Sequence, residues 1–175
     1  MLKTILLVLL AIIVIAFIYA YFAEKKFSIV SEIVINKSKP EVFEYTKLIK
    51  NQEKWSKWVM ADPNIQIQYS GTDGEVGFKS AWQSDDKNVG VGEQEIMKIN
   101  GTDGFEVEIR FKKPFEGISQ AEYRLDSLAE NQTKITTTFY SENPFPINLM
   151  IPIIKNMLKK DMDQNSANLK RQLEQ

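Results

Sequence analysis

The chain's fold is decided by residues 147–173, which read INLMIPIIKNMLKKDMDQNSANLKRQL. The apolar residues of this run recur mostly at steps of three and four, the spacing that puts side chains on one stripe of a helix. They are Ile147, Met150, Ile151, Ile154, Met157, Leu158, Met162, Leu169 and Leu173. Because Pro152 lacks a backbone donor and clashes with the preceding turn, residues 147–151 are expected to form a separate turn before the main helix.

The residues between Phe27 and Ser141 are expected to supply the surface on which this helix packs. Residues 27–36, FSIVSEIVIN, predict a first strand, and two short helices should follow it. The first of these helices ends near Ile49, and the second carries Trp55 and Trp58 on one face. Strand patterns then cover residues 65–70, 76–83, 89–99, 105–112, 120–126 and 134–140.

Short turns join these strands, and strands joined in this way pair antiparallel. The predicted fold class is therefore α+β, with a curved antiparallel sheet of about six to seven strands around one long C-terminal helix.

Near the N-terminus, residues 5–23 (ILLVLLAIIVIAFIYAYFA) contain no charged side chain. As a helix they would extend about 28 Å, close to the hydrocarbon thickness of a bilayer. We interpret residues 1–26 as a single-pass membrane anchor and residues 27–175 as one domain. The alternative is a cleaved signal peptide, but the apolar run exceeds the usual ~7–15 residues and no small-x-small site ends it.

The side of the membrane on which the domain lies is left open by the flanking charges. Lys3 stands before the apolar run, and Lys25, Lys26, Lys37 and Lys39 stand after it, which favours a cytoplasmic domain. Insertion as a signal anchor would instead place the domain outside.

Composition excludes several classes of function. The chain has no Cys and no His, which removes disulfides, a thiolate nucleophile, the commonest general base and the commonest transition-metal ligand. Outside residues 1–26 there are 19 basic and 22 acidic residues, which argues against a nucleic-acid partner. No Gly-rich run leads from a strand into a helix, so a nucleotide loop is unsupported. No cofactor, metal site or catalytic residue is predicted.

Several stretches resemble a known family. They are GTDGEVGFKSAWQSDDKNVGVGEQEI (71–96), IRFKKPFEG (109–117), the LxxLAENQTKI run (125–135), the Trp55/Trp58 pair and the terminal NLKRQLE (168–174). Together they are similar to the polyketide cyclase/dehydrase and lipid-transport family of the START-like (SRPBCC, helix-grip) superfamily. The resemblance spans about residues 27–174. It implies a helix-grip fold with a cavity between the concave face of the sheet and the long helix.

Ten apolar residues are candidates to line that cavity and bind a ligand, since ligand cavities are mostly apolar and Met adapts to irregular space. They are Trp58, Phe78, Trp82, Phe105, Phe111, Tyr123 and Phe139 from the first helices and the strands, with Met150, Ile154 and Met157 from the long helix. The alternative interpretation is that these side chains only fill the core.

Two glutamates are the main ionisable candidates. Glu93 and Glu95 share one face of a strand, and inside an apolar cavity they would have raised pKa values suited to acid–base chemistry. Ile96 favours the other face, with Gly92 and Gln94, as the inward one, which would leave both glutamates at the surface. The inward face of residues 89–99 stays open.

Charged residues of the long helix have simpler interpretations. Asp161 and Asp163 should point apart on a helix, so they do not predict a metal site. Lys155, Lys159 and Lys160 form either a solvated face or a contact for anionic lipid headgroups.

The leading hypothesis is a membrane-anchored START-like domain that binds a hydrophobic small molecule or lipid in an internal cavity. One alternative is a regulatory or interaction module with a vestigial cavity. Another is a cyclase, dehydratase or hydrolase, which without His or Cys would depend on Glu93, Glu95 or Tyr123 as acid and base.

Overall fold

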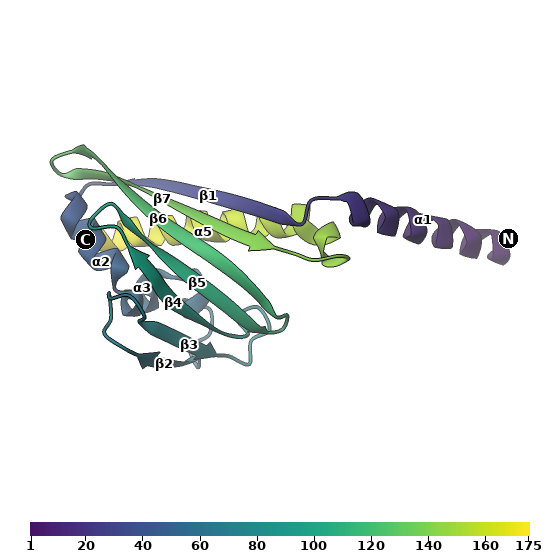
Figure 1. Ribbon diagram of the computed structural model, residues 1–175, viewed down its shortest axis with the longest axis horizontal. Coiled ribbons are helices and arrows are strands. Elements are labelled where there is room, and N and C mark those ends of the chain that lie inside the picture. Colours follow the sequence, from purple (N-terminus) through teal and green to yellow (C-terminus); the bar gives the residue numbers. More distant parts are fainter.

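Seven antiparallel strands form one curved sheet that wraps around the long C-terminal helix (Figure 1). This is seen in a computed structural model that describes residues 1–175. The strands are β1 (Lys26–Ile35), β2 (Gln66–Ser70), β3 (Lys79–Gln83), β4 (Val91–Ile99), β5 (Gly104–Lys113), β6 (Gly117–Ala129) and β7 (Gln132–Glu142). Their spatial order is β1-β7-β6-β5-β4-β3-β2, so only β1 lies out of chain order, beside the last strand. The predicted α+β helix-grip class is confirmed.

The helices are α1 (Leu2–Phe22), α2 (Lys39–Lys47), α3 (Gln52–Trp55), α4 (Lys57–Met60) and α5 (Ile151–Leu173), with 3-10 turns η1 (Ile49–Asn51) and η2 (Ile147–Met150). The separate turn expected before Pro152 is confirmed, because η2 ends at Met150 and Pro152 stands in the first turn of α5. α5 packs mainly along β1, and α1 extends away from the sheet (Figure 1).

The prediction of one helix carrying Trp55 and Trp58 is wrong, because the chain is extended at Ser56, between α3 and α4. Hydrogen bonds from α5 explain why the helix is interrupted at Ser56. The Asn168 amide donates to the Trp55 carbonyl (3.0 Å), and the Lys57 N–H donates to the Asn165 side-chain oxygen (2.6 Å). Tertiary hydrogen bonds therefore take backbone groups that a continuous helix would have used itself.

The strand predicted from residue 76 begins only at Lys79. Gly77 has a φ of +86°, which is not a strand conformation, and Val76 before it is exposed. Phe78, Ser80 and Trp82 nevertheless share the concave face, as the alternation predicted, because Phe78 continues the line of β3.

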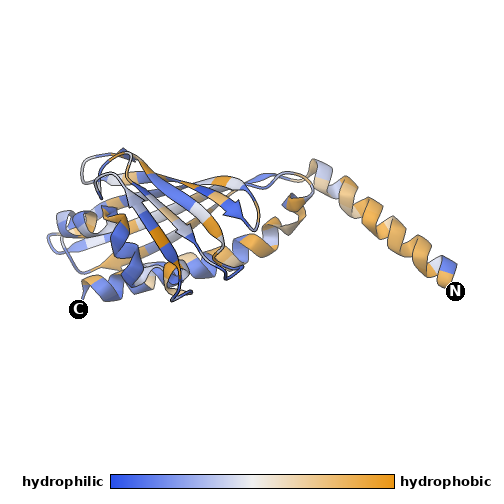
Figure 2. Ribbon diagram, turned by 90° about the horizontal axis from the view of Figure 1, so that it is seen from below, coloured by the Kyte–Doolittle hydropathy of each residue, from blue (hydrophilic) through white to orange (hydrophobic).

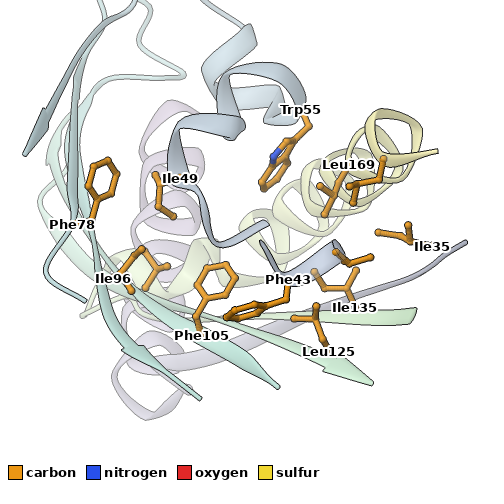
Figure 3. Packing of buried hydrophobic residues seen from close by; sticks show 13 residues of the cluster. Ile35, Phe43, Ile49, Trp55, Phe78, Ile96, Phe105, Leu125, Ile135 and Leu169 are labelled. Atoms are coloured by element: carbon orange, nitrogen blue, oxygen red, sulfur yellow. The ribbon is translucent and has the colours of Figure 1, made fainter. Parts of the chain in front are cut away.

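The interior contains two apolar clusters. The larger lies between the sheet, α2 and the C-terminal half of α5 (Figure 3), and consists of Ile35, Val42, Phe43, Ile49, Trp55, Phe78, Ile96, Phe105, Val107, Leu125, Ile135, Leu169 and Leu173. The smaller consists of Phe27, Ile29, Phe139 and Met162, at the end of the sheet nearer α1. Six half-buried side chains pack against the smaller cluster: Trp58, Ile109, Phe111, Ile151, Ile154 and Leu158. The first half of α5 therefore meets a less completely buried part of the sheet than the second half does.

Leu125 of β6 tests the contribution of the larger cluster to stability. Leu125→Ala should lower the free energy of unfolding by about 2–5 kcal/mol, because it leaves a cavity in a closely packed core. Urea unfolding of the full-length chain in detergent micelles measures this loss. Leu128→Ala is the matched control, since Leu128 lies on the same strand with its side chain exposed. Equal losses in the two variants would contradict the assigned core.

Candidate ligand-binding site

The concave face of the sheet is defined by residues directly opposite one another on neighbouring strands. Phe105 pairs with Tyr123, which pairs with Thr137, and Thr137 pairs with Ser31. Residues that pair in this way point to the same side of the sheet. The face that meets α5 therefore carries a continuous row across four strands.

The ten predicted ligand residues divide into three groups by burial. Phe78, Phe105 and Phe139 are buried members of the two core clusters. Trp58, Trp82, Phe111, Tyr123 and Ile154 are half-buried. Met150, at the end of η2, and Met157, on α5, are exposed and do not pack against either cluster. The structure thus divides the predicted set between the two clusters and places the two methionines at the surface.

Trp82 and Phe111 form the aromatic part of the half-buried group. Their rings meet edge to face, with centroids 6.1 Å apart, and the Trp82 indole donates to the Val89 carbonyl (3.2 Å). Gly92 permits this arrangement, because a Cβ at that position would lie 2.5 Å from the indole ring. The absence of a side chain at Gly92 thus makes room for an aromatic ring on the concave face.

Trp58 reaches the same region from α4. Its indole N–H donates to an Asp161 carboxylate oxygen (3.3 Å), which links α4 to α5. Asp161 also accepts a hydrogen bond from Lys57, whereas Asp163 accepts hydrogen bonds from Ser31 and Lys159. The two aspartates point apart, as the helical spacing predicted.

Tyr123 is the central polar group of the concave face. Its ring stacks on Phe105 with centroids 4.5 Å apart, and its hydroxyl makes no hydrogen bond to the protein. Burial raises the pKa of Tyr123 to about 12, so the phenol is neutral at physiological pH and is able to donate.

Several other polar groups on this face have partners. Gln94 donates to Gln52 of α3 (2.7 Å), and the hydroxyls of Ser119 and Ser141 bond to each other (2.9 Å). The hydroxyls of Tyr123 and of its neighbour Thr137 make no such bond.

The ten candidates did not include Ile109 and Leu158, which belong to this region, whereas Gln94 was expected here under one of the two alternatives for residues 89–99. Ile109 alternates with Phe105 and Phe111 along β5, and Leu158 belongs to the apolar stripe of α5, so both signals were present. Gln94 was visible only through its alternation with Ile96.

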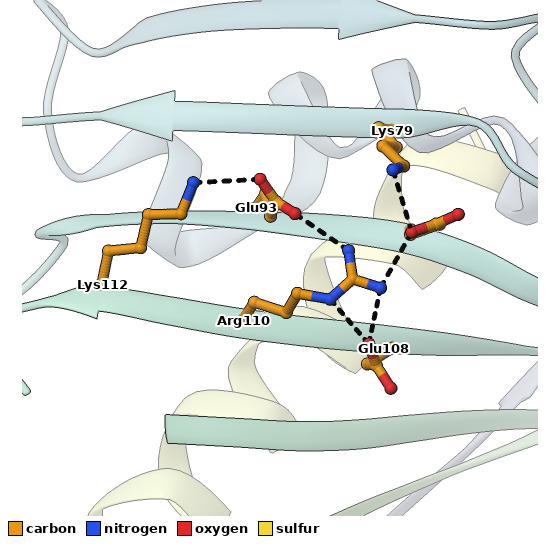
Figure 4. A network of polar contacts seen from close by, with 6 residues as sticks. Lys79, Glu93, Glu108, Arg110 and Lys112 are labelled. Carbon is orange, nitrogen blue, oxygen red and sulfur yellow. Dashed lines mark hydrogen bonds and ion pairs between the residues drawn. The ribbon is translucent and has the colours of Figure 1, made fainter. Parts of the chain in front are cut away.

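Glu93 and Glu95 lie on the convex face, so the hypothesis that they act inside a cavity is wrong (Figure 4). Arg110 on β5 donates to Glu93 (2.9 Å), Glu95 (2.9 Å) and Glu108 (2.7 Å). Lys112 adds a second bond to Glu93 (3.1 Å). The hydrogen bonds from Arg110, and then from Lys112, lower the pKa of Glu93, the opposite of the shift that a general acid would need.

This network makes stability depend on pH. The pKa of Glu93 is lower in the folded chain than in the unfolded chain, so its contribution is present above the ordinary glutamate pKa of about 4.3 and is lost as pH falls through the folded value. Glu93→Gln should therefore weaken folding at neutral pH and reduce the loss of stability on acidification. Urea unfolding of the full-length chain at neutral and acidic pH measures both effects. Glu116→Gln, at an exposed hairpin tip, is the control. An unchanged acid response in Glu93→Gln would contradict the role of the network.

Comparison with known proteins places the fold but not the family. No family model and no curated protein matches the chain. Among solved structures, norcoclaurine synthase from Thalictrum flavum, in complex with dopamine and hydroxybenzaldehyde, is 10% identical with a TM-score of 0.64, over 85% of this chain and 86% of that one. A hypothetical protein from Helicobacter pylori is 13% identical with a TM-score of 0.62, over 87% and 91% of the two chains.

A protein from Arthrobacter aurescens is 20% identical with a TM-score of 0.57, over 83% of this chain and 86% of that one. At these identities the similarity concerns the backbone alone. The domain that follows α1 has the helix-grip fold.

Proposed function

We propose that this protein is a membrane-anchored helix-grip domain that binds a hydrophobic small molecule or lipid between the concave face of the sheet and the first half of α5. The observation that carries the proposal is the half-buried apolar group beside the smaller cluster. Its members are Trp58, Trp82, Ile109, Phe111, Ile151, Ile154 and Leu158.

The incomplete burial of this group is the first argument. Protein interiors are normally packed as densely as organic crystals, as the larger cluster is here around Phe105 and Ile96. Facing side chains that keep accessible surface instead leave apolar area for another molecule to cover.

Tyr123 supplies the second argument. Its side chain is half-buried on the concave face, and burial raises its pKa, so the phenol stays protonated. Its free hydroxyl would donate a hydrogen bond to a carbonyl, ether or hydroxyl oxygen on an otherwise apolar ligand.

The third argument comes from the ligands in the norcoclaurine synthase structure. Norcoclaurine synthase holds two small aromatic molecules in a structure with the same fold. The helix-grip fold is therefore able to enclose ligands of that size.

α1 is proposed as the anchor of the domain. It is long and apolar enough to cross a bilayer, and nearly all its large apolar side chains are exposed in the chain on its own. A cleaved signal sequence would share these features, so the anchor and the signal sequence are distinguished by whether the mature protein retains α1.

The anchor proposal predicts that the full-length chain stays in the membrane fraction after alkaline carbonate extraction. Its intact mass should remain that of the whole chain, 20.2 kDa. A shorter, carbonate-soluble product lacking α1 would show that the helix is a signal sequence.

The ligand proposal is tested by filling the interior with a tryptophan. Thr137 points into the concave face beside Tyr123, so Thr137→Trp should exclude a ligand. Thr138→Trp adds the same bulk to the convex face and should have no such effect. Each full-length variant is purified from membranes and its bound molecules are identified by native and organic-extract mass spectrometry.

Wild type and Thr138→Trp should each carry a co-purifying apolar molecule that Thr137→Trp lacks. Its absence from all three proteins would contradict the proposal and favour an interaction module with a filled interior.

A further inference from the structure

We infer that residues 144–157 form a second membrane-embedded element, which lies in the same leaflet as the C-terminal end of α1 and opens the interior toward lipid. The inference rests on the proposed membrane anchor. The inference adds to the anchor the orientation of the domain on the bilayer and the route by which a ligand enters.

The connection between β7 and α5 is fixed to α1 by hydrogen bonds. The last carbonyls of a helix have no partner within the helix and usually turn to water. Here the Asn148 amide of η2 donates to the carbonyls of Ala20 (2.6 Å) and Ala23 (3.3 Å). Asn148 and Ala20 are both buried. The Ala20 carbonyl, in the last turn of α1, is therefore capped by the domain itself and is buried.

An aromatic contact sets the depth of this connection. The rings of Phe17 and Phe145 meet edge to face with centroids 5.5 Å apart. Phe17 precedes the last residue of α1 by five positions, which is roughly 7–8 Å along the helix axis. If α1 spans the bilayer, Phe145 lies well below the interface, among the acyl chains.

The surface around Phe145 is suited to such a position. A groove of about 490 Å³ runs between Phe145 and α1, and every residue that lines it is hydrophobic. The lining residues are Ile13, Val14, Phe17, Ile18, Tyr21, Phe22 and Phe145. Because the groove continues the lipid-facing surface of α1, lipid chains are the occupant that its position favours.

The end of η2 and the first turns of α5 carry exposed apolar side chains in addition to those that face the sheet. Ile151, Ile154 and Leu158 face the sheet. The outer strip, defined here as Met150, Ile153 and Met157, is 47%, 62% and 55% exposed, respectively. Lys155 and Asn156 are also exposed on these turns, so the apolar part of the outer surface is the outer strip, and nothing in this chain covers it. Figure 2 shows the hydrophobic colour of α1 resuming in these turns.

The β5–β6 hairpin places further apolar side chains at the same end of the domain. Gly117 pairs with Phe111, and Ser119 pairs with Ser141 near the end of β7, so the hairpin tip lies at the end of the sheet where the chain leaves for α5. Phe115 and Ile118 are strongly exposed there. Lys112 and Lys113 stand beside them, as suits contact with anionic headgroups.

This placement deepens the proposed function. Ile151 and Ile154 pack against the smaller cluster from one side of α5, and the outer strip lies on the other side of the same turns. Only these turns would separate the half-buried interior from the acyl chains. The ligand class that fits is a molecule dissolved in the bilayer, taken up without passing through water.

The chain has no cysteine, so single labels can be placed without altering other residues. Ile153→Cys and Met157→Cys report on the outer strip, and Leu128→Cys, at the far end of β6, is the exposed control. Ile13→Cys reports on α1. Each full-length variant carries a bimane fluorophore in nanodiscs of phosphatidylcholine and phosphatidylglycerol, and is quenched either by doxyl-labelled lipid or by aqueous iodide.

At Ile153 and Met157 the label should lose most of its fluorescence to doxyl lipid and little to iodide, and at Leu128 the reverse. Quenching by iodide at 153 and 157, with lipid quenching at 13, overturns the inference and leaves the anchor intact. Protection from both quenchers at 153 and 157 overturns it as well, because protein would then cover the strip. Absence of lipid quenching at 13 refutes the anchor, and the inference with it.

Discussion

The burial of one stripe of α5 against the sheet is the interaction on which the rest of the structure depends. Leu169 and Leu173 reach the larger cluster and Met162 reaches the smaller, so one helix joins both parts of the interior. Between these contacts, the side chains of Asn165 and Asn168 bond to the backbone on either side of Ser56. Apolar burial brings α5 to the sheet, and directional hydrogen bonds then fix its position along the sheet.

In this arrangement the C-terminal half of α5 stabilises the fold, and the N-terminal half borders the candidate binding site. The C-terminal half of α5 is bonded to α3, α4 and β1 and covers fully buried residues, each of which contributes about 1.5–3 kcal/mol. Its N-terminal half meets side chains that are only half-buried. A domain held together at one end tolerates looser packing at the other, and such regions open most easily. The candidate site lies where the structure depends on it least.

Local periodicity predicted the strands and α5 because each depends on residues that are neighbours in the chain. Periodicity failed where a residue far along the chain determines the local structure. At Ser56, the helix is interrupted because Asn165 and Asn168, more than one hundred positions away, bond to the backbone on either side. The sequence left undecided which face of β4 points inward for the same reason. Glu93 and Glu95 form ion pairs on the convex side with Arg110, which belongs to the next strand. Periodicity also grouped Met150 and Met157 with Ile154, because spacing shows that a stripe is apolar without showing what covers it.

The exposed apolar residues between β7 and α5 are hard to reconcile with an aqueous environment. Phe145, Ile147, Met150, Ile153 and Met157 are all exposed within thirteen positions, and a contiguous apolar surface of this kind on a soluble domain promotes association. The same residues lie beside α1, whose own surface needs lipid. Because Asn148 satisfies the end of α1 from within the domain, the helix and the domain share one buried junction. On this argument α1 is a structural part of the domain, and its removal would expose a surface that the fold was built to cover.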